Sequence, residues 1–410
     1  MAARGPWTRR SGIEWSVRFA LAALASACAY VGVSRTSAFI NYKRDPARAY
    51  ALAPSDGRIA AQYAQELVGS PASTREDRWR AERLATFALH QDPTAVAAAS
   101  ALGLLRQLGG RTGDARALFA YAQRLSRRDL QTQIWAIEYA VSRGDVANAL
   151  THYDIALRTA RSAPELLFPI LAAAIADPVV RTALVTTLGA SPGWGTAFIN
   201  YVAANGSDPR TAAQLLRALH RAAVKVPPEA QSAVIDALIV GEFSEDVWSY
   251  YAAIRPGSDP RRSRDPRFAA RLQSPTALDW VAVNDGGVAS SIEQSDRGGV
   301  FDFSAPPSVG GPLLRQVQVL PAGTYDLAGR SSGINQPAGS RPYWSLTCHR
   351  DGREFGRVEM LGGEADGAFN GTFSVPADCP VQVLTLVARP VETMQGLTGQ
   401  IQMVQLGSSR

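Results

Sequence analysis

AERLATFA at residues 81–88 recurs as ARALFAYA at 115–122 and as ALTHYDIA at 149–156, each copy lying 34 residues after the one before. Every copy begins and ends with alanine and has an alanine or an aromatic residue at its fifth position. Small residues at fixed offsets let antiparallel helices approach closely, and larger residues fill the space between neighbouring helix pairs. The period therefore predicts a solenoid of stacked helix pairs, which is clearest across residues 79–162.

The spacing Ala-x3-(Ala/Phe/Tyr)-x2-Ala resembles the second helix of the tetratricopeptide repeat family. The preceding helix supports the resemblance unevenly, because Ala99, Leu102 and Gly103 fit the small and apolar positions whereas Ile137 replaces a glycine in the next unit. A coincidental helical bundle is the alternative. The resemblance implies a concave face that holds a protein or peptide partner. Mapped by repeat position, seven residues would point into that groove, unless they form a merely solvated face: Arg58, Gln65, Ser100, Gln107, Gln131, Glu138 and Ser142.

Residues 164–254 continue the helical pattern without the repeat consensus. Prolines precede most of the apolar runs, and proline is favourable in the first turn of a helix. We expect five or six shorter helices that extend or cap the solenoid, with a kink or a boundary at Pro169. The helical-repeat region is therefore predicted to cover residues 41–254.

Residues 19–34 carry no charge and are bounded by Arg18 and Arg35. As a helix they span about 24 Å, somewhat short of the roughly 30 Å hydrocarbon core of a bilayer. The first interpretation is an uncleaved signal anchor, with residues 1–40 forming a cytoplasmic tail and a membrane segment. A signal peptide cleaved near Ala27 and a lipoprotein acylated on Cys28 remain open. All three place the rest of the chain outside the cytoplasm, and the first makes it a single-pass protein of the bacterial inner membrane with its bulk in the periplasm.

The net charge of +6 is confined to the N-terminal region. Residues 1–50 hold eight basic and two acidic residues, so the remaining residues sum to zero. A nucleic-acid-binding protein needs a basic field on its folded domain. Here the excess flanks an apolar segment, where it acts on membrane topology. The distribution of charge along the chain therefore argues against nucleic acid as a partner.

Residues 255–275 are rich in proline and arginine and predict a linker. From 276 to 410, short runs of alternating apolar and polar residues are separated by turn residues, which predicts nine or ten strands. This number of strands fits a sandwich or jelly roll. The expected fold is thus multidomain: an N-terminal membrane segment, an all-α tetratricopeptide-like solenoid and an all-β sandwich.

Two of the three cysteines, Cys348 and Cys379, lie in the predicted β region. A disulfide between them is expected if this region is exported, and reduced core cysteines are the alternative. Alternation in 343–348 (YWSLTC) places Trp344 and Cys348 on one side of a strand and the polar residues on the other.

The segments 320–325 (LPAGTY) and 373–380 (FSVPADCP) are similar to parts of carbohydrate-binding modules with a galactose-binding-like jelly roll. Together with the anchor and the repeats, this region resembles proteins encoded with bacterial exopolysaccharide systems. The resemblance implies a possible polysaccharide ligand. Candidate sugar-binding residues on the polar sides of strands, unless they are merely solvated, are Arg330, Tyr343, Ser345 and His349.

No motif for catalysis, metal binding or a cofactor stands out. The stretch 189–193 (GASPG) matches a hydrolase nucleophile elbow, but a helical run precedes it and Pro192 lacks the N–H that the oxyanion hole needs. The four histidines are scattered, without metal-ligand spacing. We therefore expect no enzyme activity and no cofactor.

The leading hypothesis is a non-catalytic scaffold or adaptor of the cell envelope in exopolysaccharide assembly or export. Its solenoid would hold an envelope protein and its sandwich would contact glycan. A polysaccharide-modifying enzyme with an unrecognised site is one alternative, and a purely structural membrane protein is another.

Overall fold

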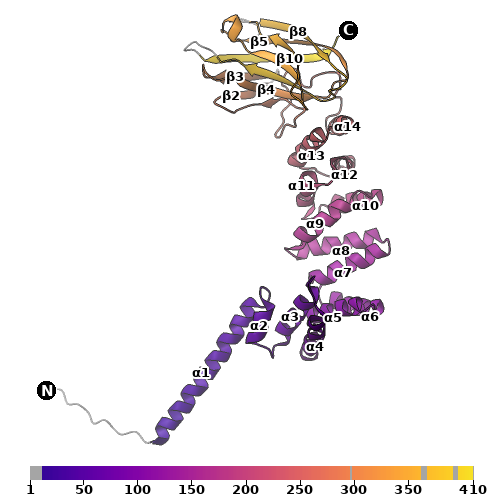
Figure 1. Ribbon diagram of the computed structural model, residues 1–410, viewed down its shortest axis with the longest axis vertical. Coiled ribbons are helices and arrows are strands. Elements are labelled where there is room, and N and C mark those ends of the chain that lie inside the picture. The colour runs from indigo at the N-terminus through magenta and orange to yellow at the C-terminus, as the bar shows by residue number, and fades with distance from the viewer. Residues whose placement is uncertain (1–11, 296–297, 362–366, 391–395, 410) are drawn as a thin grey trace, which may run out of the picture. The chain divides into compact units, whose positions relative to one another are not determined.

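The computed structural model describes residues 12–295, 298–361, 367–390 and 396–409. Within them, fourteen α-helices are followed by two antiparallel five-stranded sheets (Figure 1). The predicted fold class, with an apolar N-terminal helix, an all-α region and an all-β sandwich, is confirmed. The chain forms two compact units, one through Leu167 and the other from Phe168 onward. The four predicted domain ranges stay a prediction.

The first unit begins with α1 (Gly12–Asn41), which is long and apolar enough to cross a membrane and is not buried along that span. A signal sequence has the same properties. The following helix, α2 (Pro46–Leu52), packs against the C-terminal end of α1, beyond its apolar stretch. There Ala38 is completely buried in a cluster with Ala49 and Ile59. The apolar segment therefore continues without a break into the packed part of this unit.

Six helices follow as three antiparallel pairs, in which α3 packs on α4, α5 on α6 and α7 on α8. Their bounds are α3 (Gly57–Gly69), α4 (Arg75–Gln91), α5 (Val96–Leu108), α6 (Thr112–Leu125), α7 (Leu130–Ser142) and α8 (Val146–Thr159). Asp56, Thr74, Asp129 and Asp145 begin four of them by accepting hydrogen bonds from backbone N–H groups of the first turn.

The repeated alanines Ala81, Ala115 and Ala149 lie at matching places on α4, α6 and α8, and all three are buried. Between them, Phe119 stacks on Trp135 of the next pair with ring centroids 4.4 Å apart. The predicted roles of small residues in close helix contacts and of aromatic residues between pairs are both visible here.

Helix α9 (Ala163–Ala174) contains Pro169 and spans the boundary between the two units. The second unit continues through five shorter helices, α10 (Pro178–Gly189), α11 (Gly195–Asn205), α12 (Pro209–Arg221), α13 (Pro228–Val240) and α14 (Ser244–Ile254). Proline begins α10, α12 and α13, as the sequence predicts. Leu215, Leu216 and Leu219 bury one face of α12.

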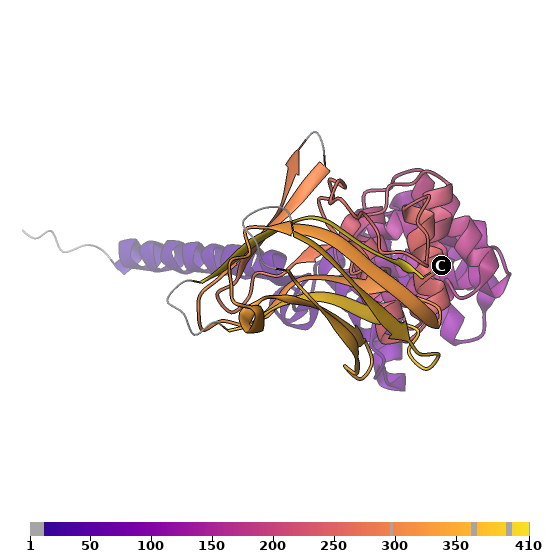
Figure 2. The same cartoon turned by 90° about the horizontal axis from the view of Figure 1, so that it is seen from above.

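The sandwich consists of two sheets, one ordered β1-β4-β9-β6-β7 and the other β2-β3-β10-β5-β8. We call them the first and the second sheet, and Figure 2 shows their strands, in orange and yellow, from above. The strands are β1 (Val281–Ala282), β2 (Ala289–Ser295), β3 (Gly298–Ala305), β4 (Gly311–Gln318), β5 (Gly323–Ser332), β6 (Tyr343–Cys348), β7 (Glu354–Glu359), β8 (Gly367–Val375), β9 (Gln382–Ala388) and β10 (Leu397–Ser408).

The core of the sandwich lies between the two sheets and is rich in aromatic residues. Trp344 and Trp280 are buried there, with ring centroids 5.9 Å apart. Phe301 and Phe303 of β3 complete the same cluster. Each strand of the second sheet thus turns alternate side chains inward and leaves the others on its outer side.

The predicted disulfide is confirmed. Cys348, the last residue of β6, is bonded to Cys379 in the loop before β9, with the two Cα atoms 5.9 Å apart. Cys28 is a free thiol exposed on α1. The bond closes a long loop in the sandwich and leaves the membrane-segment cysteine unpaired.

Candidate functional site

The predicted groove residues of the solenoid come together in part. Gln65 of α3 donates one hydrogen bond to the hydroxyl of Ser100 on α5, at 2.9 Å, and another to the carboxylate of Asp129, at 2.7 Å. Asp129 caps the N-terminus of α7, and Ser100 is completely buried. These side chains therefore link three successive helix pairs to one another. Much of their hydrogen-bonding capacity is used within the unit and is not available to a partner.

The remaining groove candidates differ in exposure. Gln107 accepts a hydrogen bond from the indole of Trp135 at 3.3 Å, and Gln131 is half-buried. Arg58, Glu138 and Ser142 are exposed, although Arg58 lies 3.8 Å from the carboxylate of Asp92 and the Ser142 hydroxyl donates to the carbonyl of Tyr139. A partner groove at these seven positions stays a prediction.

The four candidate sugar-binding residues do not form one site. Arg330 lies on β5 in the second sheet, whereas Tyr343 and Ser345 lie on β6 in the first. Ser345 stands between Arg357 and Thr385 in the strand register and is only 4% exposed. Its burial leaves Ser345 little surface that a sugar could contact.

His349 follows β6 and lines a small crevice of about 20 Å³ with Ile239 and Glu242, which lie at the C-terminal end of α13. Burial raises the pKa of Asp236 on the same helix, and the nearby Arg315 and His349 partly oppose that shift. His349 is therefore placed at the junction of α13 with the sandwich, away from Arg330 and Tyr343.

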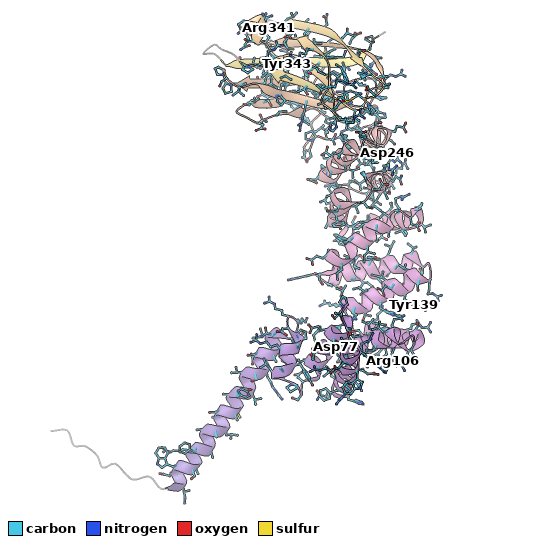
Figure 3. The ribbon with its side chains drawn as sticks, in the orientation of Figure 1. Asp77, Arg106, Tyr139, Asp246, Arg341 and Tyr343 are labelled. Atoms are coloured by element: carbon cyan, nitrogen blue, oxygen red, sulfur yellow. A yellow bond between two sulfur atoms is a disulfide. The ribbon has the colours of Figure 1, made fainter. Side chains whose placement is uncertain are left out.

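Tyr343, which Figure 3 labels in the sandwich, lies among arginine and glutamate side chains that form ion pairs. The guanidinium groups of Arg357 and Arg389 lie 4.6 and 4.4 Å from its ring centroid. Arg389 also donates two hydrogen bonds to Glu359, at 2.6 and 2.7 Å. This contact is the main reason that the pKa of Glu359 lies below its ordinary value. The two arginines take up ring surface that a sugar would need, so Tyr343 makes a poor stacking platform.

The outer side of the second sheet carries a set of amide, hydroxyl, carboxylate and guanidinium groups, which we call the polar face, with Ala328, Ala368 and Met403 among them. Its members come from all five strands and none is fully buried: Ser291, Asp302, Ser304, Arg330, Ser332, Asn370, Gln400 and Gln402. The Gln400 amide donates to Asp302 at 2.8 Å, and the Gln402 amide donates to the Ser332 hydroxyl at 2.5 Å. Cross-strand hydrogen bonds thus hold four of these side chains in place.

Arg330 is exposed on this face and has no hydrogen-bond or ion-pair partner among the described residues. Beside it, Asn370 of β8 stands opposite Ala328 of β5 in the register. No aromatic side chain belongs to the part of the polar face that the structure describes. The face therefore offers hydrogen bonds to a flexible, hydroxyl-rich ligand without a stacking platform.

Metal chemistry finds no support in the described residues, which contain no group of three or more histidine, cysteine, aspartate or glutamate side chains placed to hold an ion. The expectation of no metal site stays a prediction.

No family model matches the chain, and no curated protein matches it. Among solved structures, one described as "CBM4 structure and function" is 13% identical, covers 37% of this chain and 99% of its own, and has a TM-score of 0.27. A carbohydrate-binding module of family 6 from Cellvibrio mixtus lichenase 5A, in complex with cellotriose, is 9% identical, covers 32% of this chain and 98% of its own, and scores 0.23.

The active domain of tailspike protein 4 from bacteriophage CBA120 is 11% identical, with a TM-score of 0.24, and the match covers 32% of this chain and 19% of the tailspike chain. At this level of similarity the three structures do not identify a ligand for this protein.

Proposed function

We propose that this protein is a non-catalytic, membrane-anchored binding protein whose sandwich contacts polysaccharide. The observation that carries the proposal is the polar face. Amide, hydroxyl and carboxylate groups from neighbouring strands are held by the Gln400–Asp302 and Gln402–Ser332 hydrogen bonds, and the Arg330 guanidinium lies exposed beside them. Sugar hydroxyls both donate and accept hydrogen bonds, so such a surface matches them better than it matches an apolar ligand.

The affinity for one short oligosaccharide is expected to be weak. Stacking on aromatic rings is absent from the described polar face, and each exchanged hydrogen bond contributes only about 0.5–1.5 kcal/mol net. A long polymer presents the same unit repeatedly, which raises the apparent affinity of several anchored copies. The function therefore favours contact with a polymer over capture of a free sugar.

The proposed location is the inner membrane of a bacterium, with α1 retained as an anchor and the rest in the periplasm. The apolar, unburied α1 and the disulfide between Cys348 and Cys379 support it, because disulfides persist in oxidising compartments. Within this proposal the helix pairs are tetratricopeptide repeats that hold an envelope protein, and the complex acts in exopolysaccharide assembly or export.

The test is binding of the full chain, in detergent micelles, to a polysaccharide from an exopolysaccharide-producing bacterium. Gln400→Ala and Arg330→Ala should each weaken retention on the immobilised polymer by about threefold or more. The matched control is Arg261→Ala, since Arg261 is exposed and its backbone N–H alone makes a hydrogen bond to Asp259. Equal retention of all variants, or turnover of the polymer by the purified protein, would contradict the proposal.

A further inference from the structure

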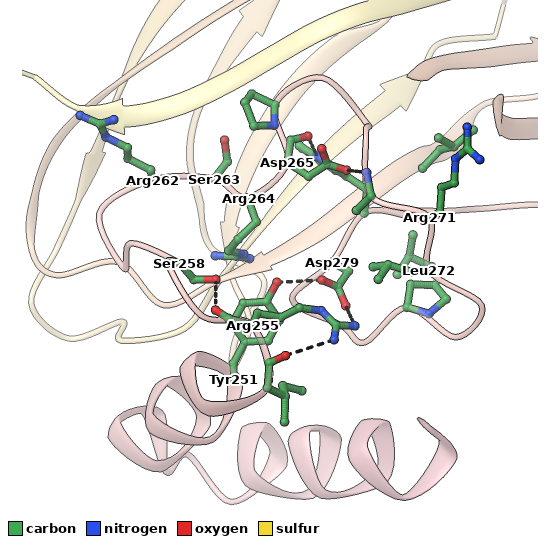
Figure 4. A pocket seen from close by; sticks show the side chains of 18 of the residues that line it. Tyr251, Arg255, Ser258, Arg262, Ser263, Arg264, Asp265, Arg271, Leu272 and Asp279 are labelled. Atoms are coloured by element: carbon green, nitrogen blue, oxygen red, sulfur yellow. Dashed lines mark hydrogen bonds and ion pairs between the residues drawn. The ribbon is translucent and has the colours of Figure 1, made fainter. Parts of the chain in front are cut away.

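A second, deeper site lies in the second unit where the end of α14 meets the 255–275 segment and strands β1, β2 and β10 (Figure 4). It is a cleft of about 1290 Å³, larger than the 300–1,000 Å³ typical of small-molecule sites. Four arginines and three aspartates line it, and the pairing of those charges decides what it can bind: Arg255, Arg262, Arg264, Arg271, Asp259, Asp265 and Asp279.

Arg264 in the cleft wall uses its guanidinium for hydrogen bonds within the protein. Its guanidinium donates to the carbonyl of Leu278 at 2.8 Å, to the side chain of Gln318 at 3.0 Å and to the carbonyl of Val317. Burial lowers the pKa of Arg264 to about 10, which still leaves it charged at neutral pH. Its role is to hold the cleft wall together, so it is not available to a ligand.

Two of the three carboxylates are also satisfied internally. Asp279 accepts from the Tyr251 hydroxyl at 2.7 Å and from the N–H and hydroxyl of Thr276, both at 2.9 Å. Asp265 accepts from the backbone N–H groups of Ala269 and Ala270. Neither carboxylate needs a cation from outside, and the acceptor side of the cleft is largely saturated.

The donor side is not saturated. The Nε of Arg255 is buried without a hydrogen-bond partner, and its nearest carboxylate atom in Asp279 lies 3.8 Å from Nη2. Arg271 has no hydrogen-bond or ion-pair partner among the described residues. Arg262 has an exposed ion pair with Asp259 at 3.7 Å. Figure 4 shows Arg255 beside Asp279, with Arg262 and Arg271 on opposite sides of the view.

We propose that this cleft binds an oxyanion carried on a saccharide, such as the carboxylate of a uronic acid unit. The proposal rests on the proposed function, because the sugar part is taken from it. The anion pairs with Arg271 and with the Arg255 guanidinium, whose side chain is 31% exposed and lies 3.8 Å from its nearest carboxylate, that of Asp279. Charge-assisted hydrogen bonds from guanidinium to carboxylate are strong and directional, and the cleft has room for the attached sugar units.

The test uses the full chain in detergent micelles and isothermal titration calorimetry with hexamannuronate, cellohexaose and sodium sulfate. Hexamannuronate should bind at least about tenfold more tightly than cellohexaose at low salt, and the difference should shrink as salt screens the charges. Sulfate should compete only at much higher concentration. Arg255→Gln should weaken hexamannuronate binding by about tenfold and Arg271→Gln by about fivefold.

Arg267→Gln is the matched control, because Arg267 is an exposed arginine of the same segment that does not line the cleft. Since Arg271 has no partner to lose, Arg271→Gln stays informative even if Arg255→Gln fails to fold. Equal binding of the acidic and neutral hexamers, equal binding of sulfate and hexamannuronate, or an equal loss in Arg267→Gln overturns the proposal. Cellohexaose binding that Gln400→Ala weakens would keep the proposed function even then, whereas no binding of either hexamer overturns the cleft proposal alone, because the proposed function is tested by retention on an immobilised polymer.

Discussion

Arg264 joins three parts of the second unit through one side chain. Its hydrogen bonds reach the Leu278 carbonyl and the Gln318 side chain, and its guanidinium lies 5.6 Å from the Tyr251 ring centroid on α14. A buried charge with this many acceptors is costly to remove, because the acceptors are left without donors.

We expect Arg264→Met to lower the free energy of unfolding of the second unit by roughly 3–5 kcal/mol. Urea denaturation followed by tryptophan fluorescence measures it. Arg261→Met, three residues earlier and exposed, should change the midpoint little. Similar midpoints for the two variants would show that the hydrogen bonds of Arg264 contribute no net stability.

His152 makes the first unit sensitive to acid. Its Nδ1 lies 2.8 Å from the Gln133 side-chain oxygen, and burial, with a smaller contribution from Arg127, lowers the pKa of His152 below 6.5. The unfolded chain then binds a proton at a higher pH than the folded one. The stability is fully present above about pH 6.5 and is lost as the pH falls through the folded pKa.

Urea unfolding of the full chain at pH 7.5 and 5.0 checks this pH dependence. The unprotonatable variant His152→Gln should show a smaller loss between the two pH values than the wild type. His90→Gln is the control, because His90 is an exposed histidine on α4. This variant should lose as much stability between the two pH values as the wild type. An unaltered loss in His152→Gln would assign the acid sensitivity to other groups.

The candidate binding residues show where sequence reasoning stops. Alternation along one strand assigns a residue to a side, so Arg330 was recognised as outward-facing. Sheet membership depends on pairing between distant strands, which no local pattern encodes. The sequence therefore could not show that Arg330 and Tyr343 lie in different sheets. Arg255 and Arg271 lay inside a segment that composition predicted to be a linker, and only the neighbouring Asp279 and Tyr251 give them a site.

At the scale of elements, the 34-residue period was informative because close helix packing restricts side-chain size directly. Gly103 of α5 illustrates it: a Cβ added there would lie 2.9 Å from the Phe119 ring of α6. Phe119 is buried and stacked on Trp135, so it has little freedom to move away. The helices after residue 164 carry no such repeat in their sequence, so their packing could not be predicted from a period.

Gly103→Ala should therefore destabilise the first unit by about 1–3 kcal/mol through overpacking. Gly113→Ala is the matched control on α6, where the added methyl group meets nothing within 4 Å. That change should be neutral or slightly stabilising, because alanine favours helix over glycine by about 1 kcal/mol. Thermal unfolding of both variants decides, and a stabilised Gly103→Ala would contradict the packing argument.

The disulfide staples the end of β6 to the loop before β9 across 31 residues. Replacing Cys348 and Cys379 together by alanine should lower the stability of the sandwich by about 3–4 kcal/mol, since the unfolded chain regains the entropy of an open loop. Cys28→Ala is the control because that thiol is free. Equal urea midpoints for the double variant and the control would contradict this account.

At the scale of the whole molecule, the fate of α1 decides where the protein works. Cleavage near Ala27 would cut through the middle of one continuous helix. We expect the mature protein to keep its N-terminus and to remain in the membrane fraction after carbonate washing. Intact mass spectrometry distinguishes the outcomes, since cleavage removes the N-terminal residues and acylation adds lipid to Cys28. Either of those masses would contradict a retained anchor.

The contact between α1 and α2 has a mechanical consequence for a retained anchor. Ala38 is sealed against Ala49 and Ile59 only three residues after Arg35, the charge that ends the apolar run. Between α1 and the first helix pair lie only residues 42–45, helix α2 and residues 53–56. Tilting α1 to suit a thinner or thicker lipid layer would change the orientation of that pair. Lipid composition would therefore set the direction in which the first repeats point.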